Sequence, residues 1–451
     1  MKLYHIPKTD SRKGARAVTF VIETLGCKVN QYESQAMAAL LEARGHVPCP
    51  AGETADCVIV NTCAVTGESG RKSRQAVRRL QREHPGAFTA VCGCYSQIAG
   101  DGTDELQADL IGGSGSRLAF LDRLEELFAN RSSGELRDDP MRRRVFETLP
   151  AGSIEGRTRA MLKIQDGCSN FCSYCIIPYA RGPVRSMPLA DMSREAASLA
   201  AQGYREIVVT GIEISSYGRD FRDGTDLADA LACIAGAAPG VRLHLGSLEP
   251  RTVTEEFCRR LKELPDLCDH FHLSLQSGCD DTLKRMKRRY TAGRFLESVE
   301  LLRASFPDCG ITTDLIAGFP GETEGEFEQT LAFIRACRFS AMHVFPFSPR
   351  PGTPAAQMPD PVPRAEKQRR CALASNIARE MAQAFAASQE GRTLSVLFET
   401  EKDGRWHGHS GNYLEISVPG DSLRGRVLPV RVTGSSGTLL TGKLAPDAGG
   451  A

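Results

Sequence analysis

The stretch Asp166-Gly-Cys-Ser-Asn-Phe-Cys-Ser-Tyr-Cys-Ile-Ile-Pro178 contains Cys168, Cys172 and Cys175 in the spacing C-x3-C-x2-C. Three thiolates this close together in the sequence can bind one cubane iron–sulfur cluster. A [4Fe–4S] cluster normally takes four thiolates, so three leave one iron open to a substrate or cosubstrate. A zinc site also wants four ligands, but no other Cys or His lies within about twenty residues on either side. The spacing therefore favours an iron–sulfur cluster over zinc.

This cysteine loop, with Tyr174 directly before its last cysteine, resembles that of the radical S-adenosylmethionine (SAM) superfamily. In that superfamily the amino and carboxyl groups of SAM chelate the open iron. The resemblance implies reductive cleavage of SAM to a 5′-deoxyadenosyl radical. That chemistry belongs to the cofactor, and the protein supplies binding and orientation.

The length and composition indicate an ordinary globular protein. A chain of 451 residues predicts two to three domains, and 41% hydrophobic with 25% charged residues is typical of a water-soluble fold. The sequence has no apolar run long enough for a transmembrane helix, and its first sixteen residues lack the apolar core of a signal peptide. We therefore expect a cytoplasmic protein without a membrane partner, whose sixteen cysteines are metal ligands or buried thiols rather than disulfides.

Basic residues gather in four places although the net charge is only +1. The small net charge argues against non-specific nucleic-acid binding by bulk charge. The clusters themselves suit contacts with phosphates, and solvated helix faces are the alternative that remains open. These clusters are residues 71–82, 142–144, 284–289 and 364–370.

The N-terminal block, residues 16–128, alternates strands and helices. Apolar runs predict strands at 18–26, 57–63 and 87–94, and the segments between them predict helices at 31–45 and 69–85. This order predicts an open parallel α/β sheet with crossover helices. Residues 129–157 are polar and are expected to form a linker.

The second block, residues 158–375, repeats the strand–helix order six times. The predicted strands fit a partial (β/α)6 barrel, in which functional groups gather at the C-terminal strand ends. Gly211, Ser247 and Gln276 stand at such ends. The strands are 159–165, 206–211, 241–247, 270–276, 310–318 and 341–347.

The rest of the chain predicts a connecting helix and a third domain. Residues 376–391 continue a long helix. Residues 392–446 alternate apolar and polar positions between glycine turns, which predicts a small antiparallel β-barrel. Trp406 and Tyr413 offer stacking surfaces for bases, or else they pack the interior of this barrel.

A second cysteine set lies in the N-terminal block. Cys27, Cys63 and Cys94 each follow one of three consecutive predicted strands. The C-terminal ends of parallel strands lie along one edge of a sheet, so these thiols can converge and bind a second cluster with an open iron. Cys92 competes with Cys94, because residues two apart in a strand point to the same face. The alternative is that all of them are structural buried cysteines.

From about residue 16 to residue 445 the chain resembles the methylthiotransferase family of radical-SAM enzymes. The matching motifs include Gly26-Cys-Lys-Val-Asn-Gln31, Asn61-Thr-Cys63, Gly93-Cys-Tyr-Ser-Gln97 and Phe347-Ser-Pro-Arg-Pro-Gly-Thr353. The resemblance implies an auxiliary [4Fe–4S] cluster on Cys27, Cys63 and Cys94, a SAM-binding [4Fe–4S] cluster on Cys168, Cys172 and Cys175, and a C-terminal TRAM RNA-binding domain. It also implies SAM contacts near the strand ends, for which the candidates are Tyr174, Gly211, Glu213, Ser247, Glu249 and Gln276. Glu213 stands where the family more often has His, and a carboxylate can bind the SAM amino group.

Within the family, the sequence beside Cys27 resembles the branch that acts on N6-threonylcarbamoyladenosine at tRNA position 37. The implied reaction replaces the C2 hydrogen of this adenine by a methylthio group. The expected partners are a tRNA anticodon stem-loop and an electron donor such as flavodoxin or ferredoxin, and the expected state is a monomer. The alternatives are methylthiolation of isopentenyladenosine tRNA or of a ribosomal protein and, more remotely, a non-catalytic iron–sulfur RNA-binding module.

Overall fold

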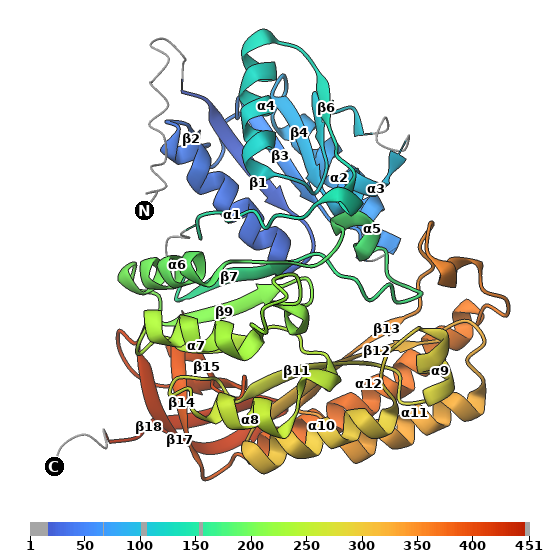
Figure 1. Cartoon of the computed structure of the whole chain (residues 1–451). Coiled ribbons are helices and arrows are strands. Elements are labelled where there is room, and N and C mark those ends of the chain that lie inside the picture. The colour runs from blue at the N-terminus through green and yellow to red at the C-terminus, as the bar shows by residue number, and fades with distance from the viewer. Residues whose placement is uncertain (1–16, 66, 101–105, 153–156, 447–451) are drawn as a thin grey trace.

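The computed structural model describes residues 17–65, 67–100, 106–152 and 157–446. The chain folds into three parts that follow one another in sequence (Figure 1). An N-terminal α/β part lies at the top of the view, a half-barrel lies below it, and a small β-barrel lies at the lower left. No helix in these described ranges has the length and apolar character needed to cross a membrane.

The N-terminal part is a six-stranded sheet in the order β2-β1-β3-β4-β5-β6, and every neighbouring pair is parallel. The predicted open parallel α/β sheet is therefore confirmed. Its strands are β1 (Thr19–Thr24), β2 (Val47–Pro48), β3 (Cys57–Thr62), β4 (Phe88–Gly93), β5 (Leu110–Gly112) and β6 (Gly134–Leu136). Its helices are α1 (Lys28–Ala43), α2 (Gly67–Glu83), α3 (Cys94–Ile98) and α4 (Arg117–Asn130).

Both faces of this sheet are covered by helices. Ile59 and Cys92 pack with apolar residues of α1 and α4 on one face. Val60 and Val91 pack with α2 on the other. Because both faces are buried, the inner strands read as continuous apolar runs, and the edge at their C-terminal ends faces the half-barrel (Figure 1).

The predicted linker at 129–157 needs correction. Gly134–Leu136 forms the edge strand β6, paired with β5. Phe146 and Leu149 are buried in the core of the half-barrel. The sequence Gly-Glu-Leu carries no alternating apolar pattern, because backbone hydrogen bonds rather than side-chain burial hold this edge strand. Residues 153–156 lie outside the described residues.

The central part confirms the predicted partial (β/α)6 barrel. Six strands follow one another in space in chain order, and the bridges Leu243 to Leu267 and Leu248 to Leu273 join its two sheets. The short β8 (Arg185–Ser186) adds an antiparallel edge beside the first strand. The six strands are β7 (Arg159–Asp166), β9 (Glu206–Gly211), β10 (Arg242–Leu245), β11 (His270–Gln276), β12 (Gly310–Ala317) and β13 (Ala341–Pro346). The helices are α5 (Ile177–Arg181), α6 (Leu189–Ala201), α7 (Leu227–Ala237), α8 (Glu255–Lys262), α9 (Asp280–Arg285), α10 (Ala292–Ser305) and α11 (Glu324–Cys337).

The C-terminal part is a closed barrel in the order β14-β15-β16-β18-β17. All pairs are antiparallel except β16 with β18. Trp406 packs inside the barrel and is 8% exposed, so it is a core residue rather than a stacking surface. A single helix, α12 (Arg364–Ala387), leads into this barrel and contains most of the predicted connecting helix. The strands are β14 (Thr393–Lys402), β15 (Arg405–Ser410), β16 (Glu415–Val418), β17 (Val427–Ser436) and β18 (Leu439–Leu444).

Candidate functional site

The first cysteine set forms a tight loop directly after β7. The Cys168 amide donates to the Gly182 carbonyl at 3.0 Å, and the Cys175 amide donates to the Cys172 carbonyl at 3.0 Å. Gly167 has φ +73°, and a Cβ atom there would collide with the Pro183 backbone. The loop therefore requires glycine before its first cysteine.

The thiols of this set lie close enough for their charges to affect the pKa values of Cys168 and Cys175. Burial is the largest cause that raises the pKa of Cys168 to about 12, and the nearby charges of Cys175 and Cys172 add to it. Burial likewise raises the pKa of Cys175 to about 12, with Cys172 adding to it. A bound metal cluster can replace these protons, because metal ligation deprotonates cysteine.

The second set also converges. Cys27 precedes α1, Cys63 follows β3 and Cys94 is the first residue of α3. Burial is the main cause that raises the pKa of each thiol. The charge of another cysteine of the set raises each pKa further. Cys63 has this effect on Cys27, Cys94 has it on Cys63, and Cys27 has it on Cys94. A Cβ atom at Gly26 would collide with the Cys63 sulfur. The structure thus brings the three predicted residues together.

Gly93 separates Cys94 from Cys92. Its φ of +108° turns the chain out of β4, and a Cβ atom at this position would collide with the Thr62 carbonyl. Cys92 therefore stays on the sheet face buried under α1 and α4. Cys94 leaves the strand and packs with Ile176 and Ala180 beside the first cysteine loop. Of the two alternatives, the structure places Cys94 in the triad.

The sulfur spacing fits a cubane better than a single ion. Among the described residues, neither triad brings its three sulfurs within 4.8 Å of one another. A tetrahedral zinc ion with Zn–S bonds near 2.3 Å needs sulfurs about 4 Å apart. A [4Fe–4S] cubane distributes its thiolates over separate irons, so wider spacing suits it.

The two triads lie near each other, because Cys94 packs against Ile176, the residue after Cys175, and Arg350 lies near one cysteine of each set. This residue lies on the loop after β13. Burial lowers the pKa of its guanidinium, while the charges of Cys63 and Cys175 oppose that effect. One cysteine of each triad is therefore close enough to act on the same side chain. No ion pair of the Arg350 side chain is found within the described part of the chain.

Glu213 is the best placed of the predicted SAM contacts. It follows β9 and lines a cleft of about 760 Å³ together with Ser169 and Asn170 of the cysteine loop. Neither of its buried carboxylate oxygens has a hydrogen-bond partner in the described structure. Burial, with the charge of Glu249 second, raises the pKa of Glu213 to about 7. Ser216, Arg219 and Ser215 offset only part of this rise in the pKa, so the buried acid suits a cationic ligand group.

The other predicted SAM contacts also stand at the open end of the half-barrel. Gly211 ends β9, and exposed Ser247 follows β10. Glu249 is buried and pairs with Arg251 at 3.1 Å. Gln276 ends β11 with φ +70°. Tyr174 packs beside Phe319 and Phe347. Their contacts with SAM remain predictions.

Comparisons with known proteins agree with this geometry. Residues 162–334 match the Radical SAM superfamily, and residues 19–113 match the uncharacterized protein family UPF0004. The threonylcarbamoyladenosine tRNA methylthiotransferase MtaB of Bacillus subtilis is 36% identical over 425 residues, which are 92% of this chain and 93% of that protein. The chain belongs to the radical-SAM methylthiotransferase family. It is therefore an enzyme, a transferase, and the predicted family is confirmed.

Two further relatives belong to two branches of the methylthiotransferases. The MtaB protein of Thermotoga maritima is 40% identical over 382 residues, covering 84% of this chain and 86% of that protein. A tRNA-2-methylthio-N(6)-dimethylallyladenosine synthase of Geobacillus kaustophilus is 34% identical over 467 residues, covering 99% of this chain and 86% of that protein.

Solved structures support the fold. The radical S-adenosylmethionine methyltransferase TsrM of Kitasatospora setae, with cobalamin and a [4Fe–4S] cluster bound, has a TM-score of 0.57 and 15% identity. The match covers 76% of this chain and 74% of TsrM. The cobalamin-dependent radical enzyme OxsB gives a TM-score of 0.51 at 10% identity, covering 82% of this chain and 56% of OxsB.

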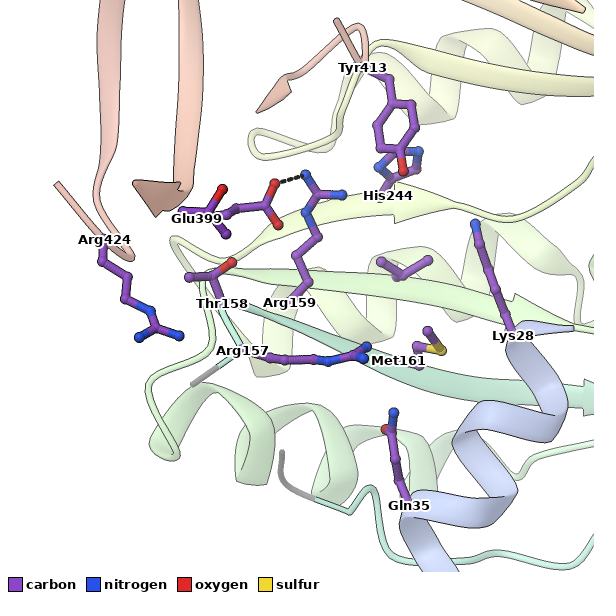
Figure 2. A pocket seen from close by; sticks show the side chains of 12 residues that line it. Lys28, Gln35, Arg157, Thr158, Arg159, Met161, His244, Glu399, Tyr413 and Arg424 are labelled. Atoms are coloured by element: carbon purple, nitrogen blue, oxygen red, sulfur yellow. Dashed lines mark hydrogen bonds and ion pairs between the residues drawn. The ribbon is translucent and has the colours of Figure 1, made fainter. Parts of the chain in front are cut away.

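A cavity of about 320 Å³ lies where the three parts of this methylthiotransferase meet (Figure 2). Lys28 reaches into it from the start of α1, and Arg159 enters from β7. Tyr413, from the loop after β15, is 41% exposed on its wall and has φ +70°. The Tyr413 ring meets His244 edge to face at 4.8 Å, and Arg159 lies 5.4 Å from its centre. Of the two aromatic candidates, only Tyr413 is accessible.

The predicted basic clusters at 284–289 and 364–370 contain arginines that make internal contacts. Arg369 and Arg370 pair with Glu324, Glu366 and Glu322 on and beside α12. Arg285 pairs with Glu326 at 2.7 Å, and Arg288 donates to the Cys172 sulfur at 3.3 Å. These four arginines are held by contacts within the protein, and phosphate contacts by the exposed members of the 284–289 and 364–370 clusters remain a prediction. Lys72, Arg78 and Arg82 of α2 remain exposed.

A buried charged network beside Cys94 was missed by sequence reasoning. Arg181, at the end of α5, is fully buried and donates to the Cys94 sulfur at 3.1 Å. It also contacts Glu33 of α1, which in turn pairs with Lys163 at 2.8 Å. The only sequence signal was the position of Arg181 six residues after Cys175, and by itself that position reads as an ordinary surface arginine.

Proposed function

We propose that this protein transfers a methylthio group to C2 of N6-threonylcarbamoyladenosine at position 37 of tRNA. The observation that supports the proposal is that the two cysteine triads lie near each other, with Cys94 packed against Ile176 and with Cys63 and Cys175 both acting on Arg350. Each triad is one ligand short of the usual four. Such an arrangement can present one base to both sites at once.

The roles of the six cysteines follow from their positions. Cys168, Cys172 and Cys175 would hold the cluster at which SAM binds, at the end of the barrel where such chemistry gathers. Cys27, Cys63 and Cys94 would hold the auxiliary cluster. When bound, the clusters and SAM supply the radical, the sulfur and the methyl group. The C2–H bond of adenine is not acidic enough for proton transfer alone to activate it.

The side chains near the two triads suit the substrates. Glu213, unpartnered in the cleft beside Cys168, would bind the amino group of SAM. Arg350 would bind the carboxylate on the threonyl arm of the substrate base. A guanidinium and a carboxylate can form paired charge-assisted hydrogen bonds.

The tRNA would enter as an anticodon stem-loop. Position 37 lies in a loop whose bases can be splayed out without opening a duplex. We assign the C-terminal barrel to the TRAM domains and propose that Tyr413 stacks on a neighbouring base at the cavity of Figure 2. We also propose a cytoplasmic monomer that takes electrons from a flavodoxin or a ferredoxin.

The dimethylallyladenosine branch is the second candidate, because one of its members is 34% identical to this chain over nearly the whole length. Complementation separates the two. We expect expression in a strain lacking its threonylcarbamoyladenosine methylthiotransferase to restore the methylthiolated nucleoside in tRNA, measured by mass spectrometry. Restoration of only the isopentenyl product, in a strain lacking that enzyme, would refute the substrate while leaving the two-triad site intact.

A further inference from the structure

Arg181 uses every donor of its guanidinium inside the protein. An arginine carries five N–H donors. The Nε atom donates to the Cys94 sulfur at 3.1 Å. Nη2 donates to Asn30 Oδ1 at 2.8 Å and to Glu33 Oε2 at 3.1 Å. Nη1 contacts Glu33 Oε1 and lies 3.5 Å from Asp166 Oδ2. The side chain is therefore fixed in one position.

The network around Arg181 contains more positive than negative side chains. Four cationic and two acidic side chains interact there, each less than 10% exposed. A buried charge without a counter-charge costs several kcal/mol, so this excess favours an anionic group beside it. The Cys94 sulfur, in contact with the guanidinium, is placed to be that group. The residues are Arg117, Lys163, Arg181 and Arg185, with Glu33 and Asp166.

The same network joins both cysteine sets. Asp166 precedes Cys168 by two residues, and Arg181 follows Cys175 by six. Asn30, which accepts from Arg181, donates to the Leu25 carbonyl before Cys27 and to the Thr62 carbonyl before Cys63. One arginine thus contacts a ligand of one triad directly and, through Asn30 and Asp166, the backbone that carries the others.

We propose that Arg181 is a positioning residue that holds the Cys94 sulfur in the auxiliary cluster and raises the reduction potential of that cluster. The proposal rests on the assignment of Cys27, Cys63 and Cys94 as cluster ligands. Hydrogen bonds to ligand sulfurs and nearby charge set the potentials of iron–sulfur clusters. A guanidinium stabilises the more negative, reduced form, so its loss lowers the potential.

The test uses the full chain with Cys168→Ala, Cys172→Ala and Cys175→Ala, reconstituted so that only the auxiliary cluster remains. We expect Arg181→Gln to shift the midpoint of an EPR-monitored redox titration to a more negative value than in this parent. Glutamine removes the charge and the donor to Cys94. Glu33 keeps its contacts with Lys163 and Arg117, so the acid is not left unpaired.

Arg117→Gln is the matched control. Arg117 is equally buried and also contacts Glu33, but its side chain makes no hydrogen bond to a triad sulfur in the described structure. We expect its midpoint to stay closer to that of the parent. Arg181→Lys, which keeps the charge and loses the fork of donors, should fall between parent and Arg181→Gln.

Each outcome bears on one claim. An Arg181→Gln protein with the parent midpoint overturns the role of Arg181. If it folds, as judged by circular dichroism and thermal unfolding alongside Arg117→Gln, but holds no iron while Arg117→Gln does, the positioning role is supported. A parent that holds no cluster, or that keeps its cluster when Cys94→Ala is added, overturns the ligand assignment, and the role of Arg181 falls with it.

Discussion

The turn at Gly93 separates Cys92 from Cys94, and it underlies the proposal that Cys94 rather than Cys92 binds metal. Cys92 packs under α1 and α4, whereas Cys94 faces Cys27, Cys63 and Arg181. In the otherwise intact, fully reconstituted protein, Cys94→Ala should lower the iron content from about eight to about four per chain. Iron and sulfide analysis with EPR measures this loss.

Cys92→Ala is the control for that substitution. It removes a thiol of the same strand end and should leave both clusters in place. Loss of one cluster from Cys92→Ala but not from Cys94→Ala would reverse the assignment.

Glu206, at the start of β9, carries a second buried network. It pairs with Arg242, with Arg159 at 3.4 Å and with His244 at 3.2 Å. Burial alone would raise the pKa of this carboxyl. Contacts with His244, Arg242 and Arg159 outweigh burial and hold the pKa below its ordinary value. Glu206→Gln leaves the buried Arg242 without its acid, while Arg159 keeps its ion pair with Glu399 at 2.7 Å, and should cost about 3 kcal/mol of stability at pH 7.

The effect should depend on pH. Because folding lowers the pKa of Glu206, its carboxylate stabilises the fold above the unfolded value of 4.5 and this contribution is lost as the pH falls below that value. The gap in urea midpoint between wild type and Glu206→Gln, followed by circular dichroism, should therefore shrink from pH 7 to pH 4. Glu256→Gln, in an exposed pair with Arg259, is the control and should change little at either pH. A gap that stays constant with pH would contradict the pairing.

The sequence alone singles out the cysteines of the first triad because they lie in one short loop. The C-x3-C-x2-C spacing makes the first triad visible in one loop. The role of Arg181 could not be predicted from the sequence, because its partners Glu33 and Cys94 are 148 and 87 residues away. No periodicity or spacing reports such a contact, which exists only after two parts of the chain have docked.

The loop between β15 and β16 presents Tyr413 to the cavity beneath α1. Its φ of +70° is unusual for a tyrosine and holds the ring against His244 and Arg159. Stacking of a base on an aromatic ring contributes about 1–3 kcal/mol. Tyr413→Ala should therefore weaken tRNA binding about 5- to 150-fold, measured by filter binding at fixed salt, and should leave SAM cleavage without tRNA unchanged.

Tyr413→Phe keeps the ring and serves as the matched variant. It should bind tRNA nearly as well as the wild type. Equal tRNA affinity of Tyr413→Ala and wild type would show that Tyr413 at this cavity does not contribute to tRNA binding.

Strands that carry long apolar runs were predictable, and the short edge strands were not. β3 and β4 read as apolar runs because both of their faces are covered. β6 and β8 are two or three residues long, lie at sheet edges and carry polar residues. The backbone hydrogen bonds of such short strands cannot be predicted from the pattern of side chains.

At the scale of the whole molecule, the substrate site that we propose lies between two parts of the chain. Arg350 belongs to the half-barrel. The charges of Cys63 in the N-terminal part and of Cys175 in the half-barrel both act on its guanidinium. Hydrogen bonds to charged groups are worth about 1.5–3 kcal/mol. Arg350→Gln should therefore lower kcat/KM about 10- to 100-fold on tRNA bearing threonylcarbamoyladenosine, measured with the reconstituted enzyme.

The control compares this loss of activity with the loss on a second tRNA substrate. The same variant should lose less activity on tRNA whose position 37 carries no carboxylate arm, if that tRNA reacts at all, and should still cleave SAM. An equal loss of SAM cleavage would show that Arg350 serves the cofactor rather than the substrate.

The domain order and the two strand-end triads were readable from the sequence, because each depends on local periodicity. The meeting of the triads was not, since it depends on how α3 and α5 pack. Cys94 lies against Ile176 and Ala180 in that contact. This contact brings the two proposed metal-binding motifs close to each other.

The central claim is that the two triads perform different steps of one transfer. The most direct measurement quantifies 5′-deoxyadenosine and the methylthiolated nucleoside together, in reconstituted protein with tRNA, SAM and dithionite. We expect both products from wild type, neither from the Cys168→Ala, Cys172→Ala and Cys175→Ala triple variant, and 5′-deoxyadenosine without methylthiolation from Cys27→Ala. Undiminished methylthiolation by Cys27→Ala, or 5′-deoxyadenosine from the triple variant, would contradict the account.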